Sequence, residues 1–98
     1  MAGRGMVRTL ALMIFALLPT KEGAATVPRG ADGVRRLEPR ELRGGMDRYL
    51  EEGGEFAVFF PGCRALAAPF VMFRLKRTGF SRCLVEEADG GLWVRGRR

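Results

Sequence analysis

The sequence predicts a small α/β domain built around one βαβ unit, and three observations lead to that fold class. An apolar run, Glu55 to Phe60, has the length and composition of a buried strand. A helix-like segment that ends in basic residues follows it, and a second β-favouring run, Phe80 to Glu87, comes next. The connection between the two runs is long enough for a crossover, so we expect a right-handed unit with two parallel, paired strands.

The first 25 residues have the layout of a secretory signal peptide. Arg4 and Arg8 precede an apolar stretch at 9–18, Pro19 breaks that stretch, and small residues stand at 23–25. The stretch is shorter than the roughly 20 apolar residues that cross a bilayer. We therefore expect cleavage after residue 25, no membrane span in the mature chain, and a periplasmic or secreted location. An uncleaved anchor or a core helix is the alternative.

Residues 26–36 are expected to form a flexible segment with at most a short edge strand, since proline and glycine alternate with charges there. The α/β domain then occupies residues 37–98. Its first element is an amphipathic helix that starts with Pro39 at the first helical position. Four apolar residues follow with helical spacing, namely Leu42, Met46, Tyr49 and Leu50. Gly44 and Gly45 predict a kink unless tertiary contacts support this helix.

The strand Glu55 to Phe60 is apolar at nearly every position, which is typical of a central strand covered on both faces. The next helix is expected within residues 65–78, with Pro69 in its first turn and Gly79 as its C-cap. The second strand is centred on Cys83. An Asp-Gly-Gly turn at 89–91 follows, and residues 92–94 close the domain with apolar bulk.

Charge and composition exclude several kinds of site. The chain has 17 Lys and Arg, 11 Asp and Glu, a net charge of +6 and no histidine. Ser-His and Cys-His catalysis are therefore excluded within this chain, and the commonest metal ligand is missing. Opposite charges are interspersed except in the C-terminal arginines, which disfavours a nucleic-acid partner. The carboxylates at 86–89 have no spaced partner, so a solvated turn is favoured over a metal site, and the sequence predicts no cofactor.

Cys63 is the candidate reactive group. It follows a buried strand and a Pro-Gly turn, and Arg64 and a helix N-terminus come directly after it. Both features lower a thiol pKa, and Arg64 is a candidate anion contact. One alternative is a Cys63–Cys83 disulfide, as in many short exported chains, and another is two buried inert thiols. A parallel pair would hold these cysteines more than about 10 Å apart, whereas a disulfide needs Cα atoms within about 7 Å, so the two exclude each other.

The residues around Cys63 resemble the C-terminal half of a rhodanese-like domain, here truncated. The similarity rests on the strand Phe56–Phe60, the Gly62-Cys63-Arg64 loop with its Ala-rich helix, and the Gly-Gly-Leu-Trp run at 90–93. It implies a cysteine that becomes a persulfide in a cradle of backbone N–H groups and transfers sulfur to a thiophilic acceptor. Cys63 would be that nucleophile, with Arg64 as the neighbouring positive charge.

The order of residues in the loop departs from that family's pattern. Aligning Arg64 with the family arginine places Phe59 at the cysteine position, which implies an inactive site. The loop is also similar to the thioredoxin active-site turn. In that comparison Phe60 stands at the nucleophilic position, and Cys63 matches the second, resolving cysteine.

Three functions follow from these patterns. The first is a small exported rhodanese-like protein that acts as a non-catalytic or accessory module for a small thiol or sulfur anion. The second is a sulfurtransferase or thiol-disulfide enzyme that uses Cys63. The third is a secreted interaction protein stapled by a Cys63–Cys83 disulfide. The sequence specifies neither the substrate nor the partner.

Overall fold

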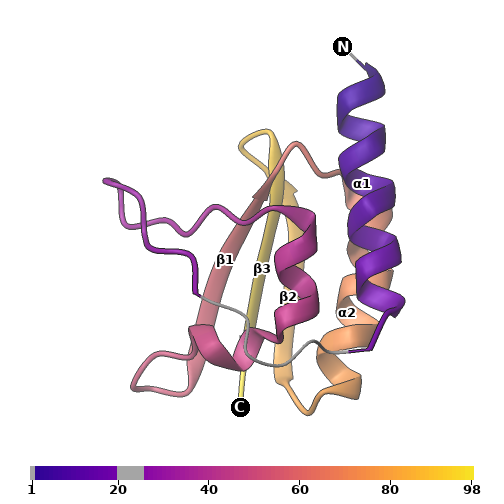
Figure 1. Ribbon diagram of the computed structural model, residues 1–98. Helices are drawn as coiled ribbons and strands as arrows, with labels where there is room; N and C mark the ends of the chain where they lie inside the picture. Colours follow the sequence, from indigo (N-terminus) through magenta and orange to yellow (C-terminus); the bar gives the residue numbers. More distant parts are fainter. Residues whose placement is uncertain (1, 20–25) are drawn as a thin grey trace.

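The computed structural model describes residues 2–19 and 26–98, with side chains from residue 6 onward. Helices cover one face of a three-stranded sheet (Figure 1). In chain order the elements are α1 (Ala2–Leu17), the 3-10 helices η1 (Pro39–Gly44) and η2 (Met46–Tyr49), β1 (Glu55–Pro61), the 3-10 helix η3 (Ala65–Ala67), α2 (Ala68–Arg77), β2 (Ser81–Ala88) and β3 (Gly91–Arg97).

The sheet is antiparallel, so the predicted parallel pairing is wrong. The strand order is β1-β3-β2, and β3 pairs antiparallel with both neighbours. It follows that β1 and β2 run in the same direction, joined by the α2 crossover, but β3 lies between them and takes the hydrogen bonds of both. The α/β class is confirmed, and the expected βαβ unit is present in a split form.

The β2–β3 hairpin explains why β3 takes this place. Asp89 and Gly90 form its two-residue loop, and both have positive φ values, 57° and 77°. That is the loop conformation whose twist suits a tight hairpin, and Asp-Gly is a preferred pair for it. The hairpin places β3 against β2, and the other edge of β3 is then free to pair with β1.

The central strand is β3, and not β1 as the apolar run predicted. On the face away from the helices, Phe59 of β1 packs against Trp93 of β3 with ring centroids 4.8 Å apart. The outer edge of β1 is covered by a single parallel bridge to Arg36. There the Leu37 N–H donates to the Phe59 carbonyl at 2.8 Å. Phe59 is therefore apolar on the outward face because it packs on Trp93, whereas Phe56, Val58 and Phe60 are buried in the core.

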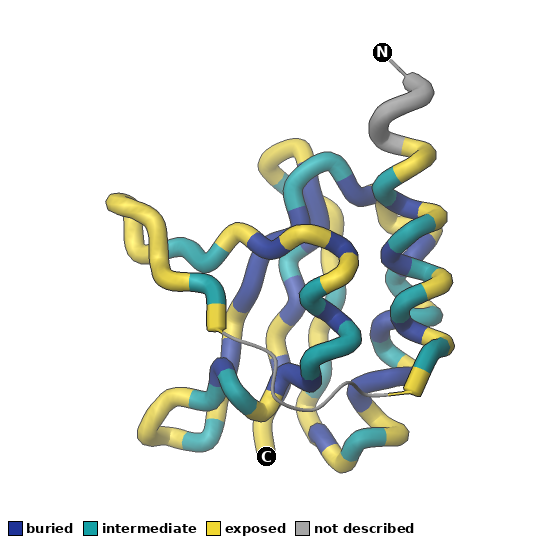
Figure 2. The backbone as a smooth tube through the Cα atoms, in the orientation of Figure 1, coloured by how far each residue is buried: buried dark blue, intermediate teal, exposed yellow. Residues whose placement is uncertain are grey.

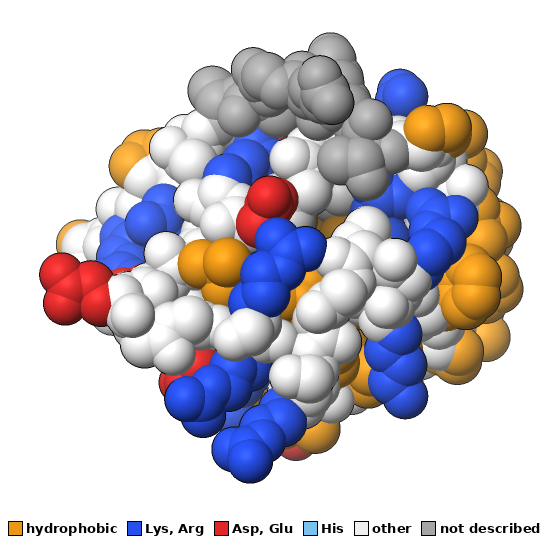
Figure 3. All heavy atoms as spheres, turned by 90° about the horizontal axis from the view of Figure 1, so that it is seen from below, with side chains coloured by type: hydrophobic (Ala, Val, Ile, Leu, Met, Phe, Trp, Pro, Cys, Tyr) orange, Lys and Arg blue, Asp and Glu red, His pale blue; other side chains and the backbone are white. Residues whose placement is uncertain are grey.

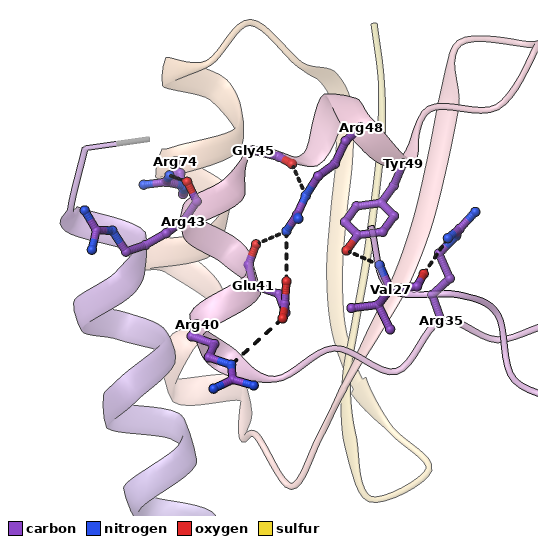
Figure 4. A network of polar contacts seen from close by, with 9 residues as sticks. All are labelled: Val27, Arg35, Arg40, Glu41, Arg43, Gly45, Arg48, Tyr49 and Arg74. Atoms are coloured by element: carbon purple, nitrogen blue, oxygen red, sulfur yellow. Dashed lines mark hydrogen bonds and ion pairs between the residues drawn. The ribbon is translucent and has the colours of Figure 1, made fainter. Parts of the chain in front are cut away.

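Contacts with η2 hold part of the segment at 26–36, which the sequence predicted to be flexible (Figure 4). The Tyr49 hydroxyl accepts a bond from the Val27 N–H at 3.1 Å, and Arg35 donates to the Val27 carbonyl at 2.6 Å. Arg48 lies over the Tyr49 ring and donates to the carbonyl of Glu41 at 2.6 Å. The network ties the segment to the domain.

The amphipathic helix predicted after Pro39 is broken into η1 and η2. Gly45, with φ 80° and ψ 136°, separates the two 3-10 helices in a conformation that glycine adopts without strain. The expected kink is confirmed. Leu42, Met46 and Tyr49 are buried, as their spacing predicted.

The expected helix after Cys63 is confirmed as α2, which has Pro69 in its first turn. Gly79 follows its C-terminus with φ 95°. Arg74 is one of the basic residues in the last turn of α2, and it is only 2% exposed. Its guanidinium donates to the carbonyls of Phe15 and Ala16 at 3.2 Å each, and to that of Arg43 at 3.3 Å. Arg74 therefore caps the C-terminal end of α1 from a neighbouring helix.

The segment predicted as a signal peptide forms α1, which packs against α2 and η1 (Figures 1 and 2). Leu12 and Ala16 are completely buried and belong to the same core as Leu42, Val71 and Val94. The cleavage expected after residue 25 stays a prediction. The small residues expected at the cleavage site, 23–25, lie outside the described residues. No helix in the described ranges is long and apolar enough to cross a membrane.

β2 forms one edge of the sheet and carries an irregularity near its start. The register with β3 shifts between Ser81 and Leu84, and Arg82 has a positive φ of 49°. This is the pattern of a β-bulge, which bends an edge strand and turns its side chains to new directions.

Candidate functional site

Cys63 lies in the core and not at the surface. β1 ends at Pro61, Gly62 turns the chain with φ 74°, and Cys63 follows with only 1% of its surface exposed. Its thiol donates a weak bond to the Arg8 carbonyl at 3.8 Å. The Arg8 guanidinium in turn donates to the Pro61 carbonyl at 2.6 Å. Helix α1 thus covers the turn that carries Cys63.

Burial raises the pKa of the Cys63 thiol above its ordinary value of 9.0. The positive charge of Arg8 and a hydrogen bond with that residue offset part of this increase, and Glu38 adds to it. A nucleophilic cysteine needs a lowered pKa and access to a substrate. Cys63 has neither, so its surroundings favour an inert thiol.

The backbone N–H groups that were expected to cradle an anion are occupied by the protein itself. The Arg64 N–H donates to the Thr9 hydroxyl at 2.9 Å, and the Ala65 N–H donates to the Glu87 carboxylate at 2.6 Å. Glu87 also lies 3.6 Å from the Arg64 guanidinium, which is largely exposed. The loop therefore has the charge pattern of an anion site, but Glu87 fills it.

The two cysteines lie at opposite ends of the sheet, and both are free thiols. Cys63 follows Pro61, which pairs with Gly91 at the start of β3, whereas Cys83 lies beside the other end of β3. About five residues of β3 separate these two ends, or about 16 Å. A disulfide needs Cα atoms within about 7 Å, so the alternative of a Cys63–Cys83 disulfide does not fit this fold.

A second candidate site lies on the open face of the sheet, opposite the helices. Residues of β1, β2 and β3 form the floor of a hollow of about 390 Å³, and residues 29, 33 and 51 stand beside it. Four arginines line it: Arg29, Arg82, Arg95 and Arg97. We call this hollow the sheet-face pocket.

Two of these arginines are neutralised within the pocket. Arg29 forms an ion pair with Glu51, and Arg97 lies 3.4 Å from Glu55. No ion pair joins Arg82 or Arg95 to a carboxylate in the described part of the chain. The pocket therefore has an excess of positive charge, with donors that remain available.

The sheet-face pocket is apolar as well as basic. Ala57 and Leu84 flank Arg95 in the strand register. Leu84 is 46% exposed, and the Arg95 guanidinium lies 5.6 Å from the centre of the Trp93 ring. The Trp93 indole donates to Asp89 at 3.0 Å, which holds the ring in place. A ligand in this hollow would meet apolar side chains beside the guanidinium groups of Arg82 and Arg95.

The sequence interpretation missed this pocket because it took residues 92–94 as apolar bulk rather than as part of a strand. The sequence does contain a pattern that predicts this strand. Residues 92–97 alternate between Leu92, Val94 and Gly96 on one side and Trp93, Arg95 and Arg97 on the other. A period of two is typical of a strand with one buried face.

No family model matches the chain, and no curated protein or solved structure is significantly similar to it. The rhodanese-like resemblance stays a prediction, and the function has to be argued from the two sites described above.

Proposed function

We propose that this chain is a non-catalytic binding module that holds a small anion in the sheet-face pocket. The observation that carries this proposal is the pair Arg82 and Arg95, which line one hollow and form no ion pair with a carboxylate among the described residues. Guanidinium groups bind oxyanions through paired, charge-assisted hydrogen bonds. The two other arginines of the pocket already have carboxylate partners.

The surroundings of Cys63 support a non-catalytic role. A sulfurtransferase or thiol-disulfide enzyme needs an accessible thiolate, whereas Cys63 is buried and its pKa is raised. A secreted protein stapled by a disulfide needs a Cys63–Cys83 bond, which the sheet geometry disfavours. A binding module requires neither an accessible thiolate nor a Cys63–Cys83 disulfide, so it is the function that agrees best with the fold.

The rhodanese-like resemblance suggests the chemical class of the ligand. It points to sulfur anions, of which thiosulfate is the simplest probe. Phosphate is the comparison, because it offers a similar oxyanion without a sulfane sulfur. Binding of both would assign the pocket to oxyanions in general.

Trp93 makes the experiment possible without a label, since it is the one tryptophan in the sequence and packs under Arg95. Thiosulfate and phosphate are titrated into the full chain at constant ionic strength while tryptophan fluorescence is followed. We expect saturable binding, and the variant Arg82→Gln should weaken it by about tenfold, the effect of losing one charge-assisted contact.

The control variant is Arg64→Gln, which removes the same charge from the opposite face of the molecule. Arg64→Gln should leave the affinity within about twofold, the scatter of a distant surface substitution. If Arg64→Gln abolishes binding and Arg82→Gln does not, the anion site is the Cys63 loop and the proposal is wrong. A titration without saturation would also reject it.

A further inference from the structure

The outward side of α1 is as apolar as its buried side. Five residues form this exposed surface, which we call the outer stripe: Met6, Val7, Leu10, Ile14 and Leu17. Between 46% and 67% of each is exposed. Their spacing places them on one side of the helix, opposite the buried Leu12 and Ala16. A contiguous apolar surface of this kind on a small protein marks a contact with a partner or a membrane.

The outer stripe continues onto neighbouring elements. Met6 and Leu66 line one hollow of about 390 Å³ at the N-terminal end of α2. Leu66 is 56% exposed, and Phe73, seven residues further along, is 55% exposed. Figure 3 shows hydrophobic side chains gathered along the right side of the molecule, where Figure 1 places α1, with Lys and Arg side chains beside them. The apolar surface therefore extends from α1 to α2.

Arginines outnumber carboxylates along the border of this surface: Arg8, Arg40, Arg64 and Arg77 lie there with Glu38 and Glu87. Arg40, which is 76% exposed, lines a hollow together with Val7 on the side of η1. Arg64 lines the hollow shared with Met6 on the other side, and Arg77 lies 5.6 Å from the centre of the Phe73 ring. The outer stripe itself contains no charged residue. Glu38 and Glu87 offset two of these charges, and the net positive charge that remains makes the border complementary to a surface that is apolar inside and anionic outside.

The same charges disfavour a second copy of this chain as the occupant. A two-fold contact through the outer stripe would bring the net positive borders of the two copies against one another. Like charges facing one another across an interface oppose binding. The length of α1 disfavours insertion across a bilayer, since its 16 residues fall short of the roughly 20 that are needed.

We infer that the outer stripe docks this protein onto the surface of an anionic lipid bilayer. Helix α1 lies flat in the interface, with Leu10 and Ile14 among the acyl chains and with Arg40 and Arg64 at the level of the headgroups. The sheet-face pocket lies on the opposite side of the sheet and stays open to water. This inference is independent of the proposed anion binding.

The test is co-sedimentation of the full chain with vesicles, after its intact mass has shown that residues 1–25 are present. Phosphatidylcholine vesicles are compared with phosphatidylcholine–phosphatidylglycerol vesicles. We expect binding to the anionic vesicles that weakens as salt rises from about 0.1 M to about 1 M, because the Debye length falls from about 10 Å to about 3 Å. The double variant Leu10→Gln/Ile14→Gln should weaken this binding by about tenfold or more.

The matched control is Leu84→Gln, since Leu84 has the same exposed fraction as Leu10, 46%, but lies on the other face of the sheet. It should bind vesicles like the wild type. Equal binding by the Leu10→Gln/Ile14→Gln variant would overturn the inference and leave only nonspecific attraction by arginines. A wild-type dimer that this variant converts to a monomer, without vesicle binding, would assign the stripe to self-association. Loss of residues 1–25 from the working protein would also overturn it.

Discussion

Cys63 illustrates how one residue's surroundings decide its chemistry. The thiol lies between the end of β1 and the backbone of α1, and burial raises its pKa above 9.0. In the unfolded chain the same thiol ionises near its ordinary value. Above that pH the unfolded chain releases the proton while the folded chain keeps it, so this group lowers the stability of the fold as pH rises.

This effect can be measured in the variant Cys83→Ala, in which Cys63 is the one thiol that titrates. The free energy of unfolding is measured in urea near pH 7 and near pH 10, with Cys63 present and with Cys63→Ala. The difference in the free energy of unfolding between the chain with Cys63 and the Cys63→Ala variant should be smaller at the higher pH by on the order of 1 kcal/mol. An unchanged difference would mean that the folded thiol ionises as readily as the unfolded one.

At the scale of elements, the contact between α1 and α2 depends on a buried cation. Arg74 donates to carbonyls in the last turn of α1, which have no partners within their own helix. We expect Arg74→Met to lower the free energy of unfolding by about 2–3 kcal/mol, because methionine fills similar space but leaves these carbonyls unpaired.

Arg77→Met serves as the comparison on the same helix. Arg77 is exposed, and its loss should change the free energy of unfolding by no more than about 0.5 kcal/mol. Equal effects of the two variants, measured by chemical denaturation, would show that apolar packing alone holds α1 in place.

For the whole molecule, the question is whether the core is complete without α1. Leu12 and Ala16 are fully buried in it. Burying one leucine side chain is worth about 2 kcal/mol, and each kcal/mol shifts the Tm of a domain this small by about 4–8 °C. A chain of residues 26–98 should therefore melt at least about 10 °C below the full chain, as followed by circular dichroism. Equal melting temperatures would instead favour a cleaved signal peptide.

Features that single residues determine could be predicted from the sequence. Pro39 begins a helical segment, Gly45 interrupts it, and Pro69 stands in the first turn of α2. Each follows from the backbone chemistry of one residue. Strand pairing could not be predicted in this way. Gly96 shows the reason, because a Cβ at this position would lie 2.6 Å from the Phe56 ring. Its place in a central strand is apparent only once β1 is beside it.

The candidate site was harder to predict than the fold. The burial of Cys63 depends on α1, more than 50 positions away in the sequence, and this helix was interpreted as a segment to be removed. The sheet-face pocket combines arginines from positions 29, 82, 95 and 97. The alternation of residues in β3 can be read from the sequence, but the pairing of β3 with β1 and β2 cannot.

The irregular start of β2 has a consequence for the behaviour of the protein in concentrated solution. An edge strand presents unpaired backbone groups on which another chain can add as a new strand, the first step towards aggregation. The edge of β1 is shielded by the bridge to Arg36. The other edge is formed by β2, which has a bulge at Arg82 near its start and two charged residues, Glu86 and Glu87, near its end. Both features disfavour the regular pairing that an incoming strand requires. The bulge at Arg82, a residue that lines the sheet-face pocket, therefore makes this edge a poor template for a further strand.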